Sequence, residues 1–184
     1  MNARIVVLVP WLVFVVFWGL SARNVKKTKI RLTPQWRWFA ARIVVIALLL
    51  VCWRSGAFRT SPLPRNSATD VVGIALCVIG VSFAIWARWH LGTNWSATPS
   101  LKEEHELVTT GPYHFVRHPI YTGALLASLG TAMVVGSPGW IVFALLCVTF
   151  VYRVGAEEQL MEAAFPNDYR SYRQRTKALI PLLW

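Results

Sequence analysis

The sequence contains few acidic residues and few cysteines. Its 184 residues include 8 Asp and Glu against 19 Lys and Arg, and the 3 cysteines form no CxxC spacing. Cys52, Cys77 and Cys147 all fall within apolar stretches, so a disulfide framework or a zinc site is not expected and these residues are predicted to pack against neighbours. Internal repeats, low-complexity tracts and a hydrophilic domain are also missing. We therefore expect one domain over residues 1–184.

The chain is too apolar for an ordinary water-soluble domain, with 55% hydrophobic and 15% charged residues. The sequence predicts an all-α integral membrane protein with five transmembrane helices at 5–20, 38–53, 71–87, 120–135 and 140–152. Several stretches are shorter than the roughly 20 residues that a span needs, so aromatic and basic flanks must complete them. Arg42, the one charged residue inside these stretches, can extend toward the headgroups. The last two helices are predicted to form a tight hairpin over residues 136–139.

The distribution of basic residues predicts the orientation. The first apolar stretch could be a signal peptide, but the basic segment after it favours an uncleaved anchor. Most of the 19 Lys and Arg residues lie in 23–37, 88–119 and 153–184, which five spans place on one side. The amino terminus is therefore expected outside and the carboxyl tail in the cytoplasm. The net charge of +11 is read as attraction to membrane lipids and not to nucleic acid, and the compact size favours a bacterial or archaeal inner membrane.

Most residues able to do chemistry follow Trp89, on the predicted cytoplasmic side. The loop before the fourth span contains all four histidines and the stretch GPYHFVRHPIYTG at 111–123. Pro119 is suited to be the first residue of that helix. The free amide groups of the helix start, beside Arg117 and His118, would suit an anionic group of a ligand.

The tail RVGAEEQLMEAAFPNDYRSYRQRTKALIPLLW forms the second chemical segment. Glu157 and Glu158 come about one turn after the predicted membrane exit, and Asp168 can cap a second short helix. Because the last two spans form a hairpin, Arg153 and the two glutamates must return to the membrane face of His118. Such a site can bind a polar cofactor that carries both a positive and a negative group.

Plainer explanations exist for each of these residues. His114 and His118 have the spacing of metal ligands, but Pro119 makes one helix across both unfavourable, so no metal is expected. Arg117 could anchor phosphate headgroups, and the two glutamates could be solvated residues of an interfacial helix. Tyr169 and Tyr172 could be interfacial packing residues. None of these features identifies an enzyme by itself.

In combination, the motifs resemble a known family. HELVTTGPYHFVRHPIYTG, followed by RVGAEEQLMEAAFPNDYRSYRQR and a terminal IP, is similar to the isoprenylcysteine carboxyl methyltransferases, within a wider group of membrane methyltransferases that includes phospholipid N-methyltransferases. The resemblance covers residues 88–184 and makes this the catalytic portion, after three membrane helices in 1–87. One departure is that relatives can carry a glutamine upstream of HxLV, whereas this chain has none between Arg88 and Ile120.

The resemblance implies a cytoplasmic pocket for S-adenosylmethionine, built by the loop before the fourth helix and the carboxyl-terminal helices. Its expected cofactor-binding residues are His105, Glu106, Leu107, Val108, Tyr113, His118, Pro119, Ile120, Tyr121, Gly123, Glu157 and Glu158. Arg153 matches the arginine attributed to substrate orientation in the family, and together with His118 it is the expected catalytic residue.

The expected reaction is O-methylation of the carboxylate of a prenylcysteine-like or other lipophilic acceptor. Such a carboxylate, with a pKa of about 4, is already ionised and needs no general base. A phospholipid amine would give His118 or Glu158 a base role, and a small thiol would need partial ionisation. Alternatives of another class are an NADPH-dependent membrane reductase and a non-catalytic membrane protein. No obligate protein partner is evident.

Overall fold

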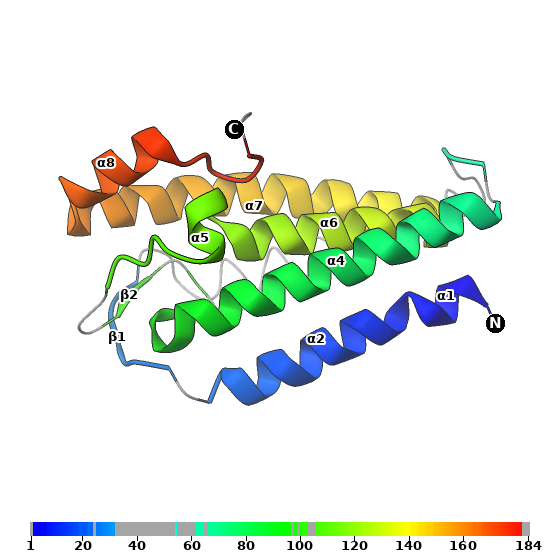
Figure 1. Cartoon of the computed structure of the whole chain (residues 1–184), viewed down its shortest axis with the longest axis horizontal. Helices are drawn as coiled ribbons and strands as arrows, with labels where there is room; N and C mark the ends of the chain where they lie inside the picture. Colours follow the sequence, from blue (N-terminus) through cyan, green and yellow to red (C-terminus); the bar gives the residue numbers. More distant parts are fainter. Residues whose placement is uncertain are drawn as a thin grey trace.

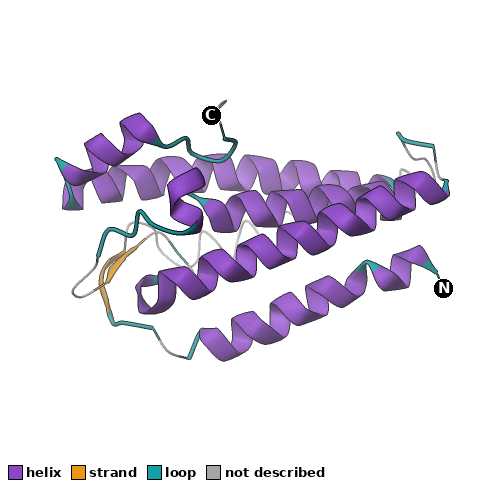
Figure 2. Cartoon of the chain, viewed as in Figure 1, coloured by secondary structure: helices purple, strands orange, loops and turns teal. Residues whose placement is uncertain are grey.

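The computed structural model describes residues 2–23, 25–31, 54, 62–64, 66–96, 98, 100–102 and 106–181. Helices dominate it (Figures 1 and 2). Its elements are α1 Ala3–Val6, α2 Leu8–Ser21, β1 Thr28–Arg31, α4 Ser67–Leu91, the 3-10 helix η2 Gly92–Asn94, β2 Ser100–Lys102, α5 Pro112–Phe115, α6 Pro119–Val135, α7 Ser137–Ala164 and α8 Asp168–Arg175.

The described helices agree with a multi-pass integral membrane protein. Three segments are long and apolar enough to cross a membrane, namely Ala3–Ser21, Ser67–Asn94 and Ser137–Ala164, and the shorter apolar helix Pro119–Val135 lies among them. These segments correspond to four of the five predicted spans. The predicted second span at 38–53, with Arg42 and Cys52, lies outside the described residues. Large apolar side chains cover the outer surface of α2, as expected where lipid is the solvent.

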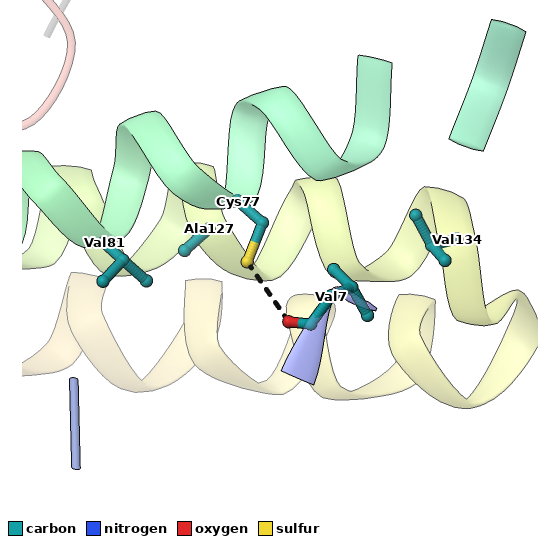
Figure 3. Packing of buried hydrophobic residues seen from close by; sticks show 5 residues of the cluster. All are labelled: Val7, Cys77, Val81, Ala127 and Val134. Atoms are coloured by element: carbon teal, nitrogen blue, oxygen red, sulfur yellow. Dashed lines mark hydrogen bonds between the residues drawn. The ribbon is translucent and has the colours of Figure 1, made fainter. Parts of the chain in front are cut away.

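The sequence predicted one helix for the first membrane segment, but the structure divides this segment into two helices. A turn at Val7 separates α1 from α2. Pro10 explains the break, because its nitrogen carries no hydrogen and cannot bond the carbonyl of Val6, four residues earlier. Val7 is fully buried, and Cys77 on α4 donates its thiol hydrogen to the Val7 carbonyl at 3.7 Å (Figure 3). Cys77 is therefore a packing residue, as predicted.

Helices α4 and α6 form the closest pair in the bundle, and Figure 1 shows them running side by side. Glycines spaced seven residues apart allow this approach, although the sequence shows no obvious GxxxG face. A Cβ atom on Gly80 would lie 2.4 Å from the Ala127 nitrogen and 2.5 Å from the Gly123 carbonyl oxygen. A Cβ atom on Gly73 would lie 2.7 Å from the Gly130 carbonyl oxygen. The two backbones are therefore in direct contact.

The hairpin between α6 and α7 is tighter than predicted. Of the expected loop 136–139, only Gly136 lies between the helices, with a φ of 91° that suits glycine. Helix α7 also continues to Ala164, twelve residues beyond the predicted end at Tyr152. Hydropathy marks where the apolar stretch ends, whereas the following residues are still good helix formers, and Pro166 lies directly after the C-cap residue Phe165.

The helical class is confirmed, with one addition. Strands β1 and β2 form a short antiparallel pair in which Thr28 lies opposite Lys102. This pair attaches the basic segment after α2 to the loop before α5. The pair, α5 and α8 gather at the same end of the bundle, away from the amino terminus (Figure 1). The residues that can take part in binding or catalysis therefore lie at one end of the membrane helices.

Candidate functional site

The site begins where Pro119 starts α6. Pro119 is the first residue of that helix, as predicted, and His118 is its N-cap residue. His114 belongs to the separate short helix α5, so no helix runs through both histidines. Among the described residues no group of metal ligands is found.

The carboxyl-terminal segment is bound directly to this helix start. The backbone amide of Arg117 donates to the Lys177 carbonyl at 2.8 Å, and that of His118 donates to the Ala178 carbonyl at 3.0 Å. The Thr122 hydroxyl donates to the Leu179 carbonyl at 2.7 Å. The RHP segment is therefore held between the bundle and the tail, which fixes the side chains on both.

Helix α8 makes the second attachment. The Tyr172 hydroxyl donates to the Tyr113 carbonyl at 2.5 Å, and burial raises the pKa of the Tyr172 phenol, which keeps it protonated as a donor. The predicted capping role of Asp168 is wrong. Asn167 is the N-cap residue, without a side-chain hydrogen bond, and Asp168 is the first residue of the helix.

Glu157 is surrounded by donors. The Tyr121 hydroxyl donates to its Oε1, His118 Nδ1 lies 3.4 Å from Oε2, and Arg153 Nη2 lies 3.7 Å from Oε1. Tyr121 and His118 come from the start of α6, whereas Arg153 and Glu157 are neighbours one turn apart on α7. The predicted return of Arg153 and Glu157 to the face of His118 is thus confirmed as geometry.

Glu158 is buried and makes a different set of contacts. Arg117 donates to its Oε1 from Nε at 2.9 Å and from Nη2 at 2.6 Å. Arg173 from α8 lies 3.5 Å from Oε2. Arg117 also donates through Nη1 to the Thr176 carbonyl. Glu158 and Arg117 therefore join α7, the RHP segment and the tail at one point, a role for Arg117 that the sequence did not reveal.

His118 lies between the two carboxylates. Its Nε2 is 3.5 Å from Glu158 Oε1, in addition to the Nδ1 contact with Glu157. Burial lowers the pKa of the imidazole, but the hydrogen bonding and charges of the two glutamates outweigh this and raise it above the usual value of 6.5. The protonated ring is thereby favoured next to Glu157.

Aromatic rings form a column beside these charges. The His118 and Tyr121 rings are stacked, with centroids 5.7 Å apart, and Tyr121 is stacked on Phe150 at 4.5 Å. The Arg153 guanidinium lies over the Tyr121 ring, 5.4 Å from its centroid. Tyr121 is held by ring contacts and by its bond to Glu157, so its position is well determined.

These side chains border a cavity of about 460 Å³. Of the predicted site residues, the following line it: Glu106, Leu107, Val108, Tyr113, His118, Ile120, Tyr121, Arg153 and Glu157. Positive, negative, aromatic and apolar groups thus border one space, of a size typical of small-molecule sites. An arrangement of this kind can hold a charged organic ligand.

Three predicted residues lie away from the lining. Pro119 is buried at the helix start, and Glu158 is buried and bound to Arg117 without lining the cavity itself. Gly123 faces α4, where a Cβ atom would lie 2.6 Å from the Gly80 carbonyl oxygen, so its close approach is to a backbone. His105 lies outside the described residues.

The sequence reading missed a second group of lining residues. Phe14 and Trp18 on α2, and Asn94 and Trp95 after α4, also border the cavity. Their α2 members lie in the amino-terminal half, which the sequence reading treated as membrane helices without chemistry. No local motif marks these residues, because they come together only through the packing of α2 on α4.

The chain is similar in sequence to known methyltransferases. The sequence profile of a family described as phospholipid methyltransferase matches residues 68–168, more than half of the chain. A protein-S-isoprenylcysteine O-methyltransferase of Schizosaccharomyces pombe is 37% identical over 83 residues, which are 44% of this chain and 35% of that protein. Protein-S-isoprenylcysteine O-methyltransferase B of Arabidopsis thaliana is 36% identical over 84 residues, which are 45% of this chain and 43% of that protein. The matched segments thus cover less than half of either relative.

A solved structure has the same fold. It is that of the eukaryotic intramembrane Ras methyltransferase ICMT, isoprenylcysteine carboxyl methyltransferase, without a monobody. The similarity has a TM-score of 0.56 at 21% sequence identity and covers 82% of this chain and 54% of that chain. The two proteins therefore share their fold over this part of the chain.

Proposed function

Because this chain belongs to the phospholipid methyltransferase family, we propose that it is an S-adenosylmethionine-dependent integral membrane methyltransferase. Its proposed reaction is O-methylation of the carboxylate of a prenylcysteine-like or other lipophilic acceptor. The observation that best supports this is the meeting of His118, Tyr121 and Glu157 at one cavity, since these residues come from two segments 36 or more positions apart.

The residues at the cavity fit this cofactor. Glu157 has contacts only to donor groups among the described residues, so its carboxylate is suited to accept from the cofactor's ammonium or ribose hydroxyls. Leu107, Val108 and Ile120 offer an apolar wall for the adenine ring. The Tyr121 ring faces a cationic group already, the Arg153 guanidinium, and an aromatic surface of this kind also suits a sulfonium.

Positioning is the main task of the chain in this reaction. When bound, S-adenosylmethionine supplies a methyl group on a positively charged sulfur, and its transfer to a carboxylate oxygen yields a thioether and an ester without moving a proton. Arg153 would hold the acceptor carboxylate by a charge-assisted hydrogen bond. His118 would keep Glu157 in place through its Nδ1 contact. No side chain needs to act as a general base, so alignment of the two reactants dominates the rate.

The proposed membrane topology places the cavity at the cytoplasmic side. The chain would cross the membrane five times, with the amino terminus outside and the tail in the cytoplasm of a bacterial or archaeal cell. Residues 88–184 would carry most of the catalytic groups on the scaffold of the first three helices. The cofactor would enter from the cytoplasm, and the apolar part of the acceptor from the bilayer beside α2, whose outer surface is covered by exposed apolar side chains.

A methyl-transfer assay tests the proposal. Purified protein in lipid nanodiscs is incubated with S-adenosylmethionine labelled in the methyl group and with three acceptors: an N-acetylated S-prenylcysteine, a phospholipid amine and a prenyl thiol. We expect base-labile label in the prenylcysteine product, because a methyl ester hydrolyses in alkali. Label in the amine or thiol product alone would refute the carboxylate assignment. The absence of saturable S-adenosylhomocysteine binding, together with oxidation of NADPH, would refute the methyltransferase assignment.

A further inference from the structure

The end of α4 carries a buried arginine that fixes one corner of the cavity. Arg88 is 2% exposed and donates from Nη1 to the Gly92 carbonyl at 2.8 Å and from Nη2 to the Ser21 carbonyl at 2.7 Å. Its guanidinium lies over the Trp95 ring, 4.6 Å from the centroid. Among the described residues no acidic side chain pairs with it. Its charge is therefore used to hold the ends of α2 and α4 and the Trp95 ring together.

This corner forms an aromatic wall of the cavity. Trp18 meets Trp95 edge to face, with centroids 5.8 Å apart, and both rings line the cavity together with Phe14. The opposite surface of α2 is open, with Leu12 65% and Val15 63% exposed, and lipid covers such residues in a membrane. Helix α2 therefore contributes aromatic side chains to the cavity and apolar side chains to the outer surface.

Asn94 carries an unsatisfied hydrogen-bond acceptor in this wall. It lines the cavity and is 7% exposed, yet its Oδ1 is buried without a hydrogen-bond partner among the described residues. The neighbouring hydroxyls are satisfied, since Ser96 and Ser100 share a hydrogen bond of 2.6 Å. A buried amide oxygen without a donor lowers stability, and a donor group of a bound ligand would satisfy it.

We propose that the Asn94 amide binds the polar head of the lipophilic acceptor, while Trp18 and Trp95 contact its apolar chain. This inference rests on the proposed methyltransferase function and adds an acceptor-binding residue to it. The groups proposed for the cofactor come from the loop before α6 and from α6 and α7, so the remaining wall at the end of α4 is left for the acceptor. Both reactants must share the cavity for an in-line transfer.

The amide chemistry makes the proposal specific. Asn94 Oδ1 would accept from the amide N–H group of an N-acylated prenylcysteine, while Arg153 holds the carboxylate of the same head by charge. An alanine at this position removes the accepting oxygen. An aspartate keeps an accepting oxygen but places a negative charge beside the acceptor carboxylate, and this repulsion should weaken acceptor binding further than alanine does.

The test compares Asn94→Ala and Asn94→Asp with wild type in nanodiscs. The dissociation constants of S-adenosylhomocysteine and of a labelled N-acetylated S-prenylcysteine are measured, together with the KM for the latter. Asn167→Ala is the matched control, because Asn167 is exposed at the start of α8 and its side chain makes no capping bond. We expect Asn94→Ala to raise the acceptor KM and dissociation constant at least about fivefold, a typical loss for one hydrogen bond. Asn94→Asp should raise both further.

Cofactor affinity separates the possible outcomes. S-adenosylhomocysteine binding should stay within about twofold of wild type in both variants, since a lost hydrogen bond to the acceptor leaves it unaffected. Unchanged acceptor binding in both variants, tighter binding by Asn94→Asp, or a parallel loss of cofactor affinity would each overturn the assignment of Asn94. Wild-type protein that binds S-adenosylhomocysteine but not the prenylcysteine overturns it too. Failure of wild type to bind S-adenosylhomocysteine refutes the proposed function instead.

Discussion

Replacing Glu158 with glutamine removes the anion at the junction of α7, the RHP segment and the carboxyl-terminal tail. Its carboxylate has a side-chain exposure of 11% and accepts two hydrogen bonds from Arg117, whose side chain is 8% exposed. The glutamine keeps the shape of the side chain but leaves the buried guanidinium without its counterion. The tail should then lose its main side-chain attachment to α7.

The expected cost follows from the burial of both partners. Breaking a buried ion pair by removing one partner costs about 3–5 kcal/mol. Because the amide oxygen of glutamine still accepts one bond, we expect the lower end, about 3 kcal/mol, for Glu158→Gln. For a chain of this length, 1 kcal/mol corresponds to about 2–4 °C in melting temperature. A decrease of about 6–12 °C is therefore expected.

Glu162→Gln provides the matched control on the same helix. Glu162 also pairs with Arg173, at 3.4 Å, but both side chains are well exposed, at 40% and 50%. Exposed pairs contribute about 0–1 kcal/mol, so this variant should melt within about 4 °C of wild type. Melting of purified protein in one detergent, followed by tryptophan fluorescence, gives both values. Equal shifts for the two variants would refute the idea that Glu158 anchors the tail.

Three further predictions concern packing, pH and the α4 corner. Gly80→Ala should lower stability by about 1–3 kcal/mol, since the new methyl group would overlap the Ala127 backbone. Gly155→Ala, in open space on α7, should instead raise stability by about 0.5–1 kcal/mol. Shifts in melting temperature of the same sign for both variants would contradict the contact between α4 and α6. The pKa of His118 is raised in the folded state by two neighbouring carboxylates despite burial, so its stabilising contribution is complete below pH 6.5 and is lost as the pH rises through the raised pKa. The melting temperature should therefore decrease as the pH rises from 6.5 through the raised pKa of His118. A His118→Gln variant whose melting temperature depends on pH as that of wild type does would show that this histidine is not responsible. Arg88→Met should loosen the end of α2, because the carbonyls of Ser21 and Gly92 lose charge-assisted hydrogen bonds worth about 1.5–3 kcal/mol each. Proteolysis after residue 21 should become faster, and an unchanged cleavage rate would contradict this.

The sequence predicted those parts of the fold that local chemistry controls. Pro119 could be assigned to the start of a helix because proline lacks the amide hydrogen that a helix interior needs. Gly136 and Pro138 indicated the hairpin, and the hairpin required Arg153 and Glu157 to return to His118. These are consequences of chain connectivity, so no tertiary information was needed.

Other features depend on contacts between distant segments and could not be predicted in this way. The Arg117 guanidinium could equally have faced lipid phosphates, and its bond to Glu158 is visible only once the tail is placed. Asn94 carries no motif, and its position in the cavity wall results from the packing of α2 on α4. Hydropathy also placed the end of α7 too early, because a helix can continue beyond the apolar stretch that indicates it.

The most direct measurement of the central claim is the binding of S-adenosylhomocysteine to wild type, Glu157→Ala and Glu162→Ala by calorimetry in nanodiscs. Glu157 lines the cavity, whereas Glu162 lies on the same helix outside its lining and pairs with Arg173. A pocket built jointly by the loop before α6 and by α7 predicts saturable binding to wild type, a loss of at least about tenfold for Glu157→Ala as for a charge-assisted hydrogen bond, and little change for Glu162→Ala. No saturable binding to wild type, or equal affinity in all three proteins, would contradict it.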